Sequence, residues 1–389
     1  MAELVSFLIF ISAGLFLSEF FRKFNVPYVV SLILAGMLIG PYGFGILEVD
    51  TTIDFLAQIG LVFLMFMAGL EIKLSGLAKY WRNIAKISTL NGLFPFAVGF
   101  FIAGFFGYDI IASSLMGIIF MSSSIAVVVP ALENKGLLKT PLGKTIVGST
   151  IIKDVLSLFA FSFLLQNIAP TTSIPLHFFY FVVLGSMIAI KLSLPKARTL
   201  LMMDREGKFE EEVRFVFASL IAVVIFFDAL GLHAIIAGFF AGLVMADSIK
   251  SRQLKQKLHA ISYGLFIPAF FIVVGTKTDL QAIGQASGAI PFVLAIVGGT
   301  ILAKFASGWI AGRFSGFDKL QSTLIGVSEI PQLSTTLAIV FIGLEMGILD
   351  AEISAAMVLL SIATTFMGSL GISIIADRYS AKRLNKQVG

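Results

Sequence analysis

Cysteine is absent from this chain of 389 residues, and histidine occurs only three times. Without cysteine the protein can form no disulfide, no covalent haem attachment and no thiolate metal site. The three histidines do not have the spacing of metal ligands, so the sequence predicts no resident cofactor. Charged residues are also scarce, because they make up 13% of the chain, whereas a soluble globular protein has about 25%.

Apolar residues make up 58% of the chain, and its mean hydropathy is +0.98. A soluble fold cannot bury this much apolar surface, so the composition predicts an all-α polytopic membrane protein surrounded by the lipid bilayer. The net charge of +5 does not indicate nucleic-acid binding, because the basic residues lie in short loops. No segment has the composition of a soluble domain or the glycine-rich fingerprint of a nucleotide site. We therefore expect a single membrane domain over 1–389, without a soluble regulatory domain.

A transmembrane helix needs about 20 mainly apolar residues, and thirteen runs in the sequence approach that length. Their approximate bounds are 3–21, 27–41, 53–72, 87–106, 110–132, 145–166, 175–194, 214–229, 231–246, 261–277, 289–312, 320–343 and 353–375. The second, eighth and ninth runs are short.

The positions of lysine and arginine predict the orientation of these runs. With the first loop in the cytoplasm, all but three of the 28 lysines and arginines fall on the cytoplasmic side or at its border. The exceptions are Lys277 on the opposite side and Lys153 and Lys304 inside helices. The positive-inside rule then predicts a multi-pass protein of the plasma membrane with its N-terminus outside and its C-terminus in the cytoplasm. The polar run Arg198–Arg214 is predicted to be a solvated cytoplasmic connector, with a regulatory site as the alternative.

Four charged residues fall inside the apolar runs, namely Lys153, Asp154, Lys304 and Glu329. A charge at the centre of the bilayer costs at least about 2.5–3.5 kcal/mol, so each of them is a candidate for function. The alternative is a structural set of ion pairs that locks a helix bundle. That alternative fits Asp154 least, because the neighbouring sequence offers no second carboxylate.

Two of the runs are predicted to be interrupted. The fifth contains Met121–Ser124 followed by Pro130, and the twelfth contains Ser328–Gln332 with Pro331 inside it. Proline removes a backbone hydrogen bond and clashes with the preceding turn. Such breaks are tolerated where they face protein or a water-filled cavity, and the freed carbonyls and helix ends can then bind an ion. The alternative is a pair of kinks without function, which are common in membrane helices.

The two interrupted runs are the fifth and the twelfth. Successive runs cross the bilayer in alternating directions, so two runs separated by an odd number of positions, here seven, cross it in opposite directions. This spacing predicts two inverted repeats of six helices, about 3–166 and 214–376, with a linker helix at about 175–194. Inverted repeats whose broken helices cross at mid-membrane are typical of secondary transporters.

Nearly the whole chain resembles the cation/proton antiporter-2 family, which includes NapA-like sodium/proton and Kef-like potassium/proton antiporters. The resemblance rests on an ordered series of segments: VPYVVSLILAGMLIGPYGFGIL, LAQIGLVFLMFMAGLEIKL, FMSSSIAVVVPALENKGLLKTPLGKTIVGSTIIKDVL, GLHAIIAGFFAGLVMADS, FIPAFFIVVGTKTDL and AKFASGWIAGRFSG. It implies an NhaA-like antiporter fold, in which a rigid core domain moves like an elevator against a dimerisation domain, and hence a homodimer.

The resemblance also assigns roles to individual residues. Asp154 matches the essential ion-binding aspartate of the family, and Ser123 and Ser124 match the hydroxyl pair in the broken helix beside it. Lys304 matches the family's intramembrane lysine. Lys153 departs from the pattern, because it stands where relatives carry a second aspartate or a glutamine.

The twelfth run holds a second departure. Its segment SEIPQLS resembles the family's S-Q-I-G-E-F-S, so Gln332 falls on the family's glutamate and Glu329 introduces a carboxylate three residues earlier. Two lysines beside one carboxylate would be costly without a second anion. We therefore expect Lys153 or Lys304 to pair with Glu329, which leaves Asp154 to alternate between a proton and a monovalent cation.

The leading functional hypothesis is an antiporter, not an enzyme, that exchanges a monovalent cation for H⁺ and so serves pH homeostasis. Na⁺ is favoured over K⁺ as the cation, and Li⁺ is a further candidate. If only Asp154 titrates, exchange is electroneutral, with one proton for one cation. If Lys153 also releases a proton on cation binding, exchange is electrogenic. The alternatives are a Kef-like K⁺/H⁺ antiporter, a non-transporting sensor in which Lys153 neutralises Asp154, and a channel. Proton-coupled counterflow separates a transporter from a sensor, and saturable coupled flux argues against a channel.

Overall fold

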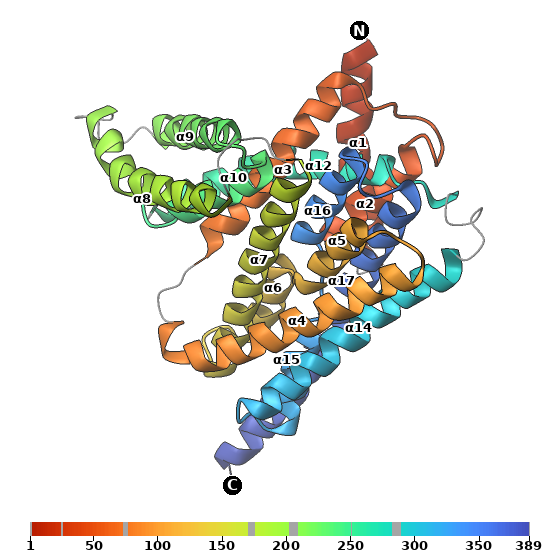
Figure 1. Cartoon of the computed structure of the whole chain (residues 1–389), viewed down its shortest axis with the longest axis vertical. Coiled ribbons are helices and arrows are strands. Elements are labelled where there is room, and N and C mark those ends of the chain that lie inside the picture. Colours follow the sequence, from red (N-terminus) through yellow and green to blue (C-terminus); the bar gives the residue numbers. More distant parts are fainter. Residues whose placement is uncertain are drawn as a thin grey trace. The chain divides into compact units, whose positions relative to one another are not determined.

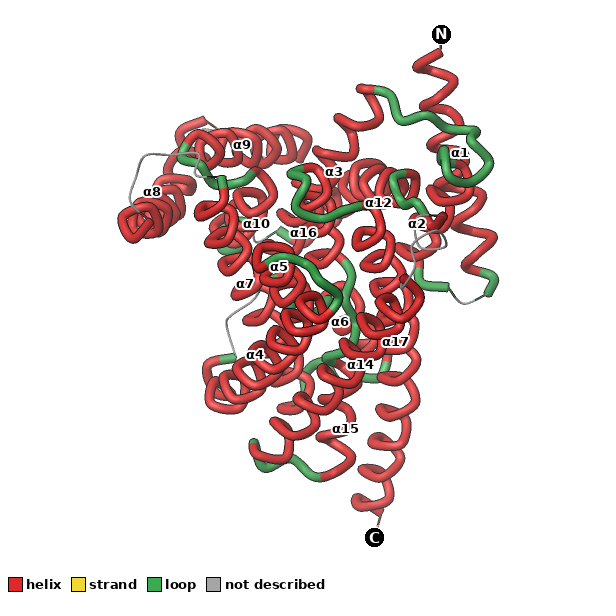
Figure 2. The backbone as a smooth tube through the Cα atoms, turned by 45° about the vertical axis from the view of Figure 1, so that its right-hand side comes forward, coloured by secondary structure: helices red, strands yellow, loops and turns green. Residues whose placement is uncertain are grey.

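A computed structural model of the chain describes residues 2–24, 26–72, 77–169, 176–201, 209–249, 251–281 and 289–388. The described residues form helices joined by turns and loops, and no strand occurs among them (Figure 2). The chain divides into two compact units. Unit 1 comprises Met1–Phe10, Val49–Lys73 and Ser162–Val273, and unit 2 comprises Ile11–Glu48, Leu74–Phe161 and Val274–Gly389.

Unit 1 is built around two helices that lie side by side, α3 (Thr51–Glu71) and α10 (Ala234–Met245). Glycine allows this close approach, because a Cβ atom at Gly242 would lie 2.1 Å from the carbonyl oxygen of Phe66. The other helices of this unit are α8 (Leu176–Leu201), α9 (Phe209–Ala229), α11 (Arg252–Ile261), the π-helical η2 (Ser262–Phe266) and the first part of α12 (Ile267–Thr276).

Unit 2 contains most of the residues singled out in the sequence, and its long helices α4 and α14 lie against each other (Figure 1). Its helices are α2 (Tyr28–Ile39), the 3₁₀ turn η1 (Ala78–Tyr80), α4 (Trp81–Phe105), α5 (Ile110–Met121), α6 (Ile125–Asn134), α14 (Ala289–Phe314), α15 (Lys319–Ser328), α16 (Ser334–Glu345) and α17 (Ala351–Val388). A hydrophobic cluster joins α4, α6, α7 (Pro141–Ile168), α14, α15 and α17. Helices α1 (Ala2–Arg22), α7 and α12 contribute to both units.

Each of the thirteen apolar runs coincides with a helix or with a pair of consecutive helices. By length and composition, eight helical segments among the described residues are long and apolar enough to cross a membrane. Four further apolar helices are shorter, with 10–17 residues. The membrane character and the helical fold class are therefore confirmed, whereas thirteen crossings and inverted repeats remain predictions.

Both predicted helix breaks are present. The first separates α5 from α6 at Ser122–Ser124, where the backbone is extended (Ser122 φ −64°, ψ 159°). Pro130, which the sequence placed in the same interruption, lies within α6 instead and does not end it. The second break separates α15 from α16 and contains Pro331, whose ring disfavours the helical conformation of the residue before it.

Three predicted boundaries were wrong. The run predicted to begin at residue 261 is part of a helical segment that begins at Arg252, because α11 is too polar to be recognised by its apolar content. The polar connector Arg198–Arg214 is helical up to Leu201 and again from Phe209, and its residues 202–208 lie outside the described residues. The last apolar run, predicted to end at residue 375, is part of a longer helix, because α17 continues to Val388.

Candidate ion-binding site

The two helix breaks are in contact inside unit 2. The backbone N–H of Ser124 donates a hydrogen bond of 2.8 Å to the carbonyl oxygen of Pro331. The hydroxyls of Ser122 and Thr336 also lie 2.8 Å apart and are hydrogen-bonded. Because each break interrupts a helix, the helix ends of α5, α6, α15 and α16 gather at one place, together with α7 and α14.

Two side chains donate hydrogen bonds to the backbone carbonyls at the end of α5, next to the first break. The acceptors are the carbonyl oxygens of Ile119, Phe120, Met121 and Ser122. The amide nitrogen of Gln332 lies 3.1–3.2 Å from three of them, which share its two N–H groups. The ammonium of Lys304 lies 3.0 Å from Met121 O and also contacts Ser122 O. A cation is favourable at the C-terminal, negative end of a helix.

This capping changes the predicted role of the freed carbonyls. They were expected to bind a transported ion, but in this conformation Lys304 and Gln332 occupy them. It also explains why an amide suits position 332, because a carboxylate there would have no N–H to donate and would face several carbonyl oxygens. The other amide atom, Gln332 Oε1, has no hydrogen-bond partner in the described part of the chain.

Lys153 is the lysine that pairs with Glu329. Its ammonium contacts Glu329 Oε2 and donates to Asn91 Oδ1 at 2.5 Å and to Ser123 Oγ at 2.8 Å. Both side chains of the ion pair are completely buried. Glu329 is the C-cap of α15, where the negative end of the helix disfavours a carboxylate, so the adjacent ammonium offsets that repulsion. The Lys153 version of the predicted pairing is therefore confirmed.

Asp154 is held differently. The residue is 3% exposed, and its carboxylate accepts a hydrogen bond of 3.1 Å from the backbone N–H of Ser123, just before the start of α6. The N-terminal end of a helix favours a carboxylate. Asp154 forms no ion pair with any residue that the structure describes, and Lys153 is engaged with Glu329. The sensor alternative, in which Lys153 neutralises Asp154, does not agree with this arrangement.

The two serines of the first break differ in their surroundings. Ser123 Oγ accepts from the ammonium of Lys153 at 2.8 Å and from that of Lys304 at 2.9 Å, so it is shared by both cations. Ser124 Oγ is buried and has no hydrogen-bond partner among residues within the described ranges. The hydroxyl oxygen of Ser124 is therefore available to a ligand, whereas that of Ser123 accepts hydrogen bonds from both lysines.

Alanine substitutions should separate these two roles. We expect Ser124→Ala to raise the apparent KM for the cation about fivefold with little change in stability, because one polar contact contributes about 1 kcal/mol. Ser123→Ala should lower the free energy of unfolding by about 1–3 kcal/mol, because it leaves buried donors unsatisfied. Ion-flux titration and thermal unfolding of both variants check this. A stability loss in Ser124→Ala with an unchanged KM would contradict it.

Sequence reasoning missed two further members of the site. Asn91 of α4 is completely buried and contacts Lys153, and Ser149 of α7 donates a 2.8 Å hydrogen bond to Glu329 Oε1. Ser149 lies four residues before Lys153, on the same helix face, so the helical spacing could have indicated it. Asn91 was less evident in the sequence, where it is a single amide side chain within an apolar run.

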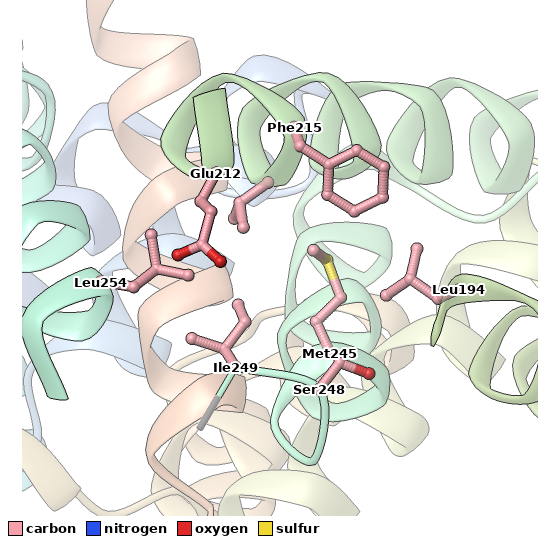
Figure 3. Close-up of a pocket in the computed structure, with 8 residues that line it drawn as sticks. Leu194, Glu212, Phe215, Met245, Ser248, Ile249 and Leu254 are labelled. Atoms are coloured by element: carbon pink, nitrogen blue, oxygen red, sulfur yellow. The ribbon is translucent and has the colours of Figure 1, made fainter. Parts of the chain in front are cut away.

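A small apolar pocket in unit 1 does not contribute to this site. Figure 3 shows Glu212 and Leu254 on one side of it and Leu194 on the other. The pocket is lined by Leu194, Glu212, Phe215, Val216, Met245, Ser248, Ile249 and Leu254. None of these residues was predicted to bind an ion. No group of three or more His, Asp or Glu side chains that could hold a metal occurs in the ranges that the structure describes.

Comparison with known proteins gives matches over nearly the whole chain. Residues 7–378 match the family described as "Sodium/hydrogen exchanger, transmembrane". The chain is 31% identical over 362 residues to "Probable Na(+)/H(+) antiporter 3" of Methanocaldococcus jannaschii, with 92% of each chain covered. It is 28% identical over 353 residues to "Na(+)/H(+)-K(+) antiporter GerN" of Bacillus cereus, with 89% of each covered.

A solved structure is also similar in fold. It is described as the sodium proton antiporter MjNhaP1 from Methanocaldococcus jannaschii at pH 8, and it matches with a TM-score of 0.71. The match covers 97% of this chain and 99% of that one at 17% sequence identity.

Proposed function

Because the chain belongs to the sodium/hydrogen exchanger family, we propose that it exchanges Na⁺, in preference to K⁺, for H⁺ across the plasma membrane. The family is one of ion transporters and not of enzymes. The observation that carries the proposal is the placement of Asp154, a buried carboxylate at the contact of two helix breaks without an ionic partner in the described residues. A buried carboxylate of this kind needs either a proton or a cation, so the two compete for it.

The surrounding charges support a stoichiometry of one proton for one cation. Lys153 and Glu329 cancel each other as a buried pair. Lys304 is bound by carbonyl oxygens and by Ser123 rather than by a carboxylate. Asp154 is then the one group that changes partner during exchange, and the unpartnered hydroxyl of Ser124 is a candidate for a further oxygen ligand. Each turnover moves one positive charge in each direction.

The finer features of the proposal follow from the sequence. The comparisons show the sodium/hydrogen exchanger family and the general class of cation/proton antiporters. The narrower assignment to the cation/proton antiporter-2 family rests on the sequence resemblance alone and stays a proposal, with a Kef-like preference for K⁺ as its alternative. All site residues lie in unit 2, which supports unit 2 as the moving core of an elevator and unit 1 as the scaffold and homodimer surface. The distribution of lysine and arginine supports an external N-terminus.

A proteoliposome experiment tests the exchange and its stoichiometry together. We expect an imposed Na⁺ gradient to drive H⁺ movement in the opposite direction, and a membrane potential to leave the final Na⁺ ratio unchanged. A potential of 100 mV acts on each net charge with about 2.3 kcal/mol, so an electrogenic exchanger would shift that ratio about 50-fold.

The potential is best set with a thiocyanate gradient, which avoids K⁺ as a competing substrate. A parallel K⁺ gradient without Na⁺ then measures the cation preference. Absence of Na⁺-dependent H⁺ movement would refute the proposed exchange. Exchange that responds to voltage would refute only the one-to-one stoichiometry and would require a second proton carrier, for which Lys153 is the candidate.

A further inference from the structure

Asn91 connects three helices at the centre of unit 2. It lies in α4, which packs along α5 and α14 (Figure 1). Its amide nitrogen donates to the carbonyl oxygen of Lys304 at 2.7 Å and to Ser307 Oγ at 2.8 Å, both in α14. Its amide oxygen accepts from Lys153 of α7 at 2.5 Å. The side chain is completely buried, so none of these contacts is shared with solvent.

The chemistry of the contacts determines how the Asn91 amide is oriented. A lysine ammonium can only donate, so the atom facing Lys153 must be the oxygen. A backbone carbonyl can only accept, so the atom facing Lys304 O must be the nitrogen. Both N–H groups of the amide are therefore used, and its oxygen is directed at Lys153.

The ammonium of Lys153 is in turn saturated. It carries three N–H groups, and it has three partners, namely Asn91 Oδ1, Ser123 Oγ and Glu329 Oε2. No donor is left for Asp154, the adjacent residue on α7. Successive side chains of a helix diverge by about 100°, but a lysine side chain is long and flexible enough to reach a neighbouring anion once one of its partners is removed.

We propose that Asn91 is a positioning residue that keeps the ammonium of Lys153 on Glu329 and thereby leaves Asp154 free for the proton and the cation. This role rests on the proposed exchange function. Asn91 is neutral, and its side-chain amide is fully used by Lys304 O, Ser307 Oγ and Lys153, so it acts through Lys153. The charged groups around it are Lys153 and Asp154 on α7, Lys304 on α14 and Glu329 at the end of α15.

The Asn91→Leu variant removes the acceptor while keeping a side chain of similar size. The ammonium of Lys153 should then turn toward Asp154 and compete there with both the proton and the cation. An opposite charge nearby shifts the proton equilibrium of a carboxylate by about one pH unit or more. We expect the pH profile of exchange to move down by about one unit and the apparent KM for Na⁺ to rise about tenfold.

Two further variants make the test specific. Ser307→Ala is the matched control, because it removes one contact of Asn91 but leaves the contact with Lys153; its KM and pH profile should stay within about twofold of the wild type. In a chain that carries Lys153→Met and Glu329→Leu, the additional Asn91→Leu change should have no further effect on KM or pH profile, because the Lys153 ammonium through which Asn91 acts is absent.

Asn91→Ala serves the same test if Asn91→Leu does not fold.

The outcomes separate the possible failures. Asn91→Leu with the KM and pH profile of the wild type, even at a lower unfolding temperature, would overturn the proposal and make Asn91 a packing residue. An undiminished effect of Asn91→Leu in the chain without Lys153 would also overturn it. Failure of the proposed function is distinct from both, because the wild-type protein would then show no exchange at all.

Discussion

The Asp154→Asn variant is expected to lose all cation-dependent proton movement while it still folds and inserts into the membrane. Asparagine has nearly the same shape as aspartate, and its side-chain oxygen can still accept the hydrogen bond from the N–H of Ser123. An amide, however, binds no exchangeable proton in the physiological range and supplies no negative charge to a cation. Proton binding is therefore lost and cation binding is weakened, so the variant cannot exchange one for the other.

This prediction is checked in proteoliposomes together with Na⁺-dependent thermal stabilisation of the purified protein. A ligand present at about 100 times its Kd stabilises the folded state by about 2.7 kcal/mol, and Asp154→Asn should lose this increment. Asp377→Asn is a suitable control, because it changes an exposed carboxylate that pairs with Lys135 on the surface of unit 2. Near-wild-type exchange by Asp154→Asn would remove this residue from the mechanism.

The second large effect concerns the buried ion pair of Lys153 and Glu329. Lys153→Met should lower the free energy of unfolding by about 3–5 kcal/mol, because it leaves the buried carboxylate of Glu329 without its counter-ion. Glu329→Leu should also be destabilising, but by less, because the ammonium of Lys153 keeps Asn91 and Ser123 as partners and can turn toward Asp154. The double variant should recover most of the loss, since replacing both members of a buried pair by apolar side chains is often neutral or stabilising.

A double-mutant cycle measures this coupling directly. Thermal or denaturant unfolding of the wild type, both single variants and the double variant gives the interaction energy. The exposed pair Lys135–Asp377 provides the comparison, because surface pairs contribute only about 0–1 kcal/mol. Additive effects at positions 153 and 329 would show that the pair does not form in solution.

Local features of the sequence were sufficient to predict the helices and their interruptions. The apolar runs coincide with helices because about 20 consecutive apolar residues are what a membrane-spanning helix requires, and this length can be read from the sequence directly. The break around Pro331 was found because its cause, a proline ring, is local. The break at Ser122–Ser124 was placed correctly at the serines, although Pro130, which contributed to the prediction, lies within α6. The start of α11 at Arg252 was missed because a polar helix end has no apolar signal.

The sequence by itself also determined which charges are buried, since Lys153, Asp154, Lys304 and Glu329 all stand inside apolar runs. It did not determine how they pair. Two lysines and two carboxylates allow several pairings, and side chains as long as lysine reach several partners. Only the tertiary structure decided that Lys153 goes to Glu329 and that Lys304 goes to the carbonyl end of α5.

Asn91 shows most clearly why the pairing of the buried side chains could not be predicted from the sequence. In the sequence it is one amide on α4, 62 residues from Lys153. Its importance comes from hydrogen bonds with α7 and α14, which exist only after those helices have packed against one another. Helix formation depends on neighbours along the chain, whereas the assignment of each proton donor to its acceptor depends on distances across the folded bundle. The sequence therefore determined the helices, their breaks and the buried charges, and the tertiary structure decided that Asp154 is left without an ionic partner among the described residues.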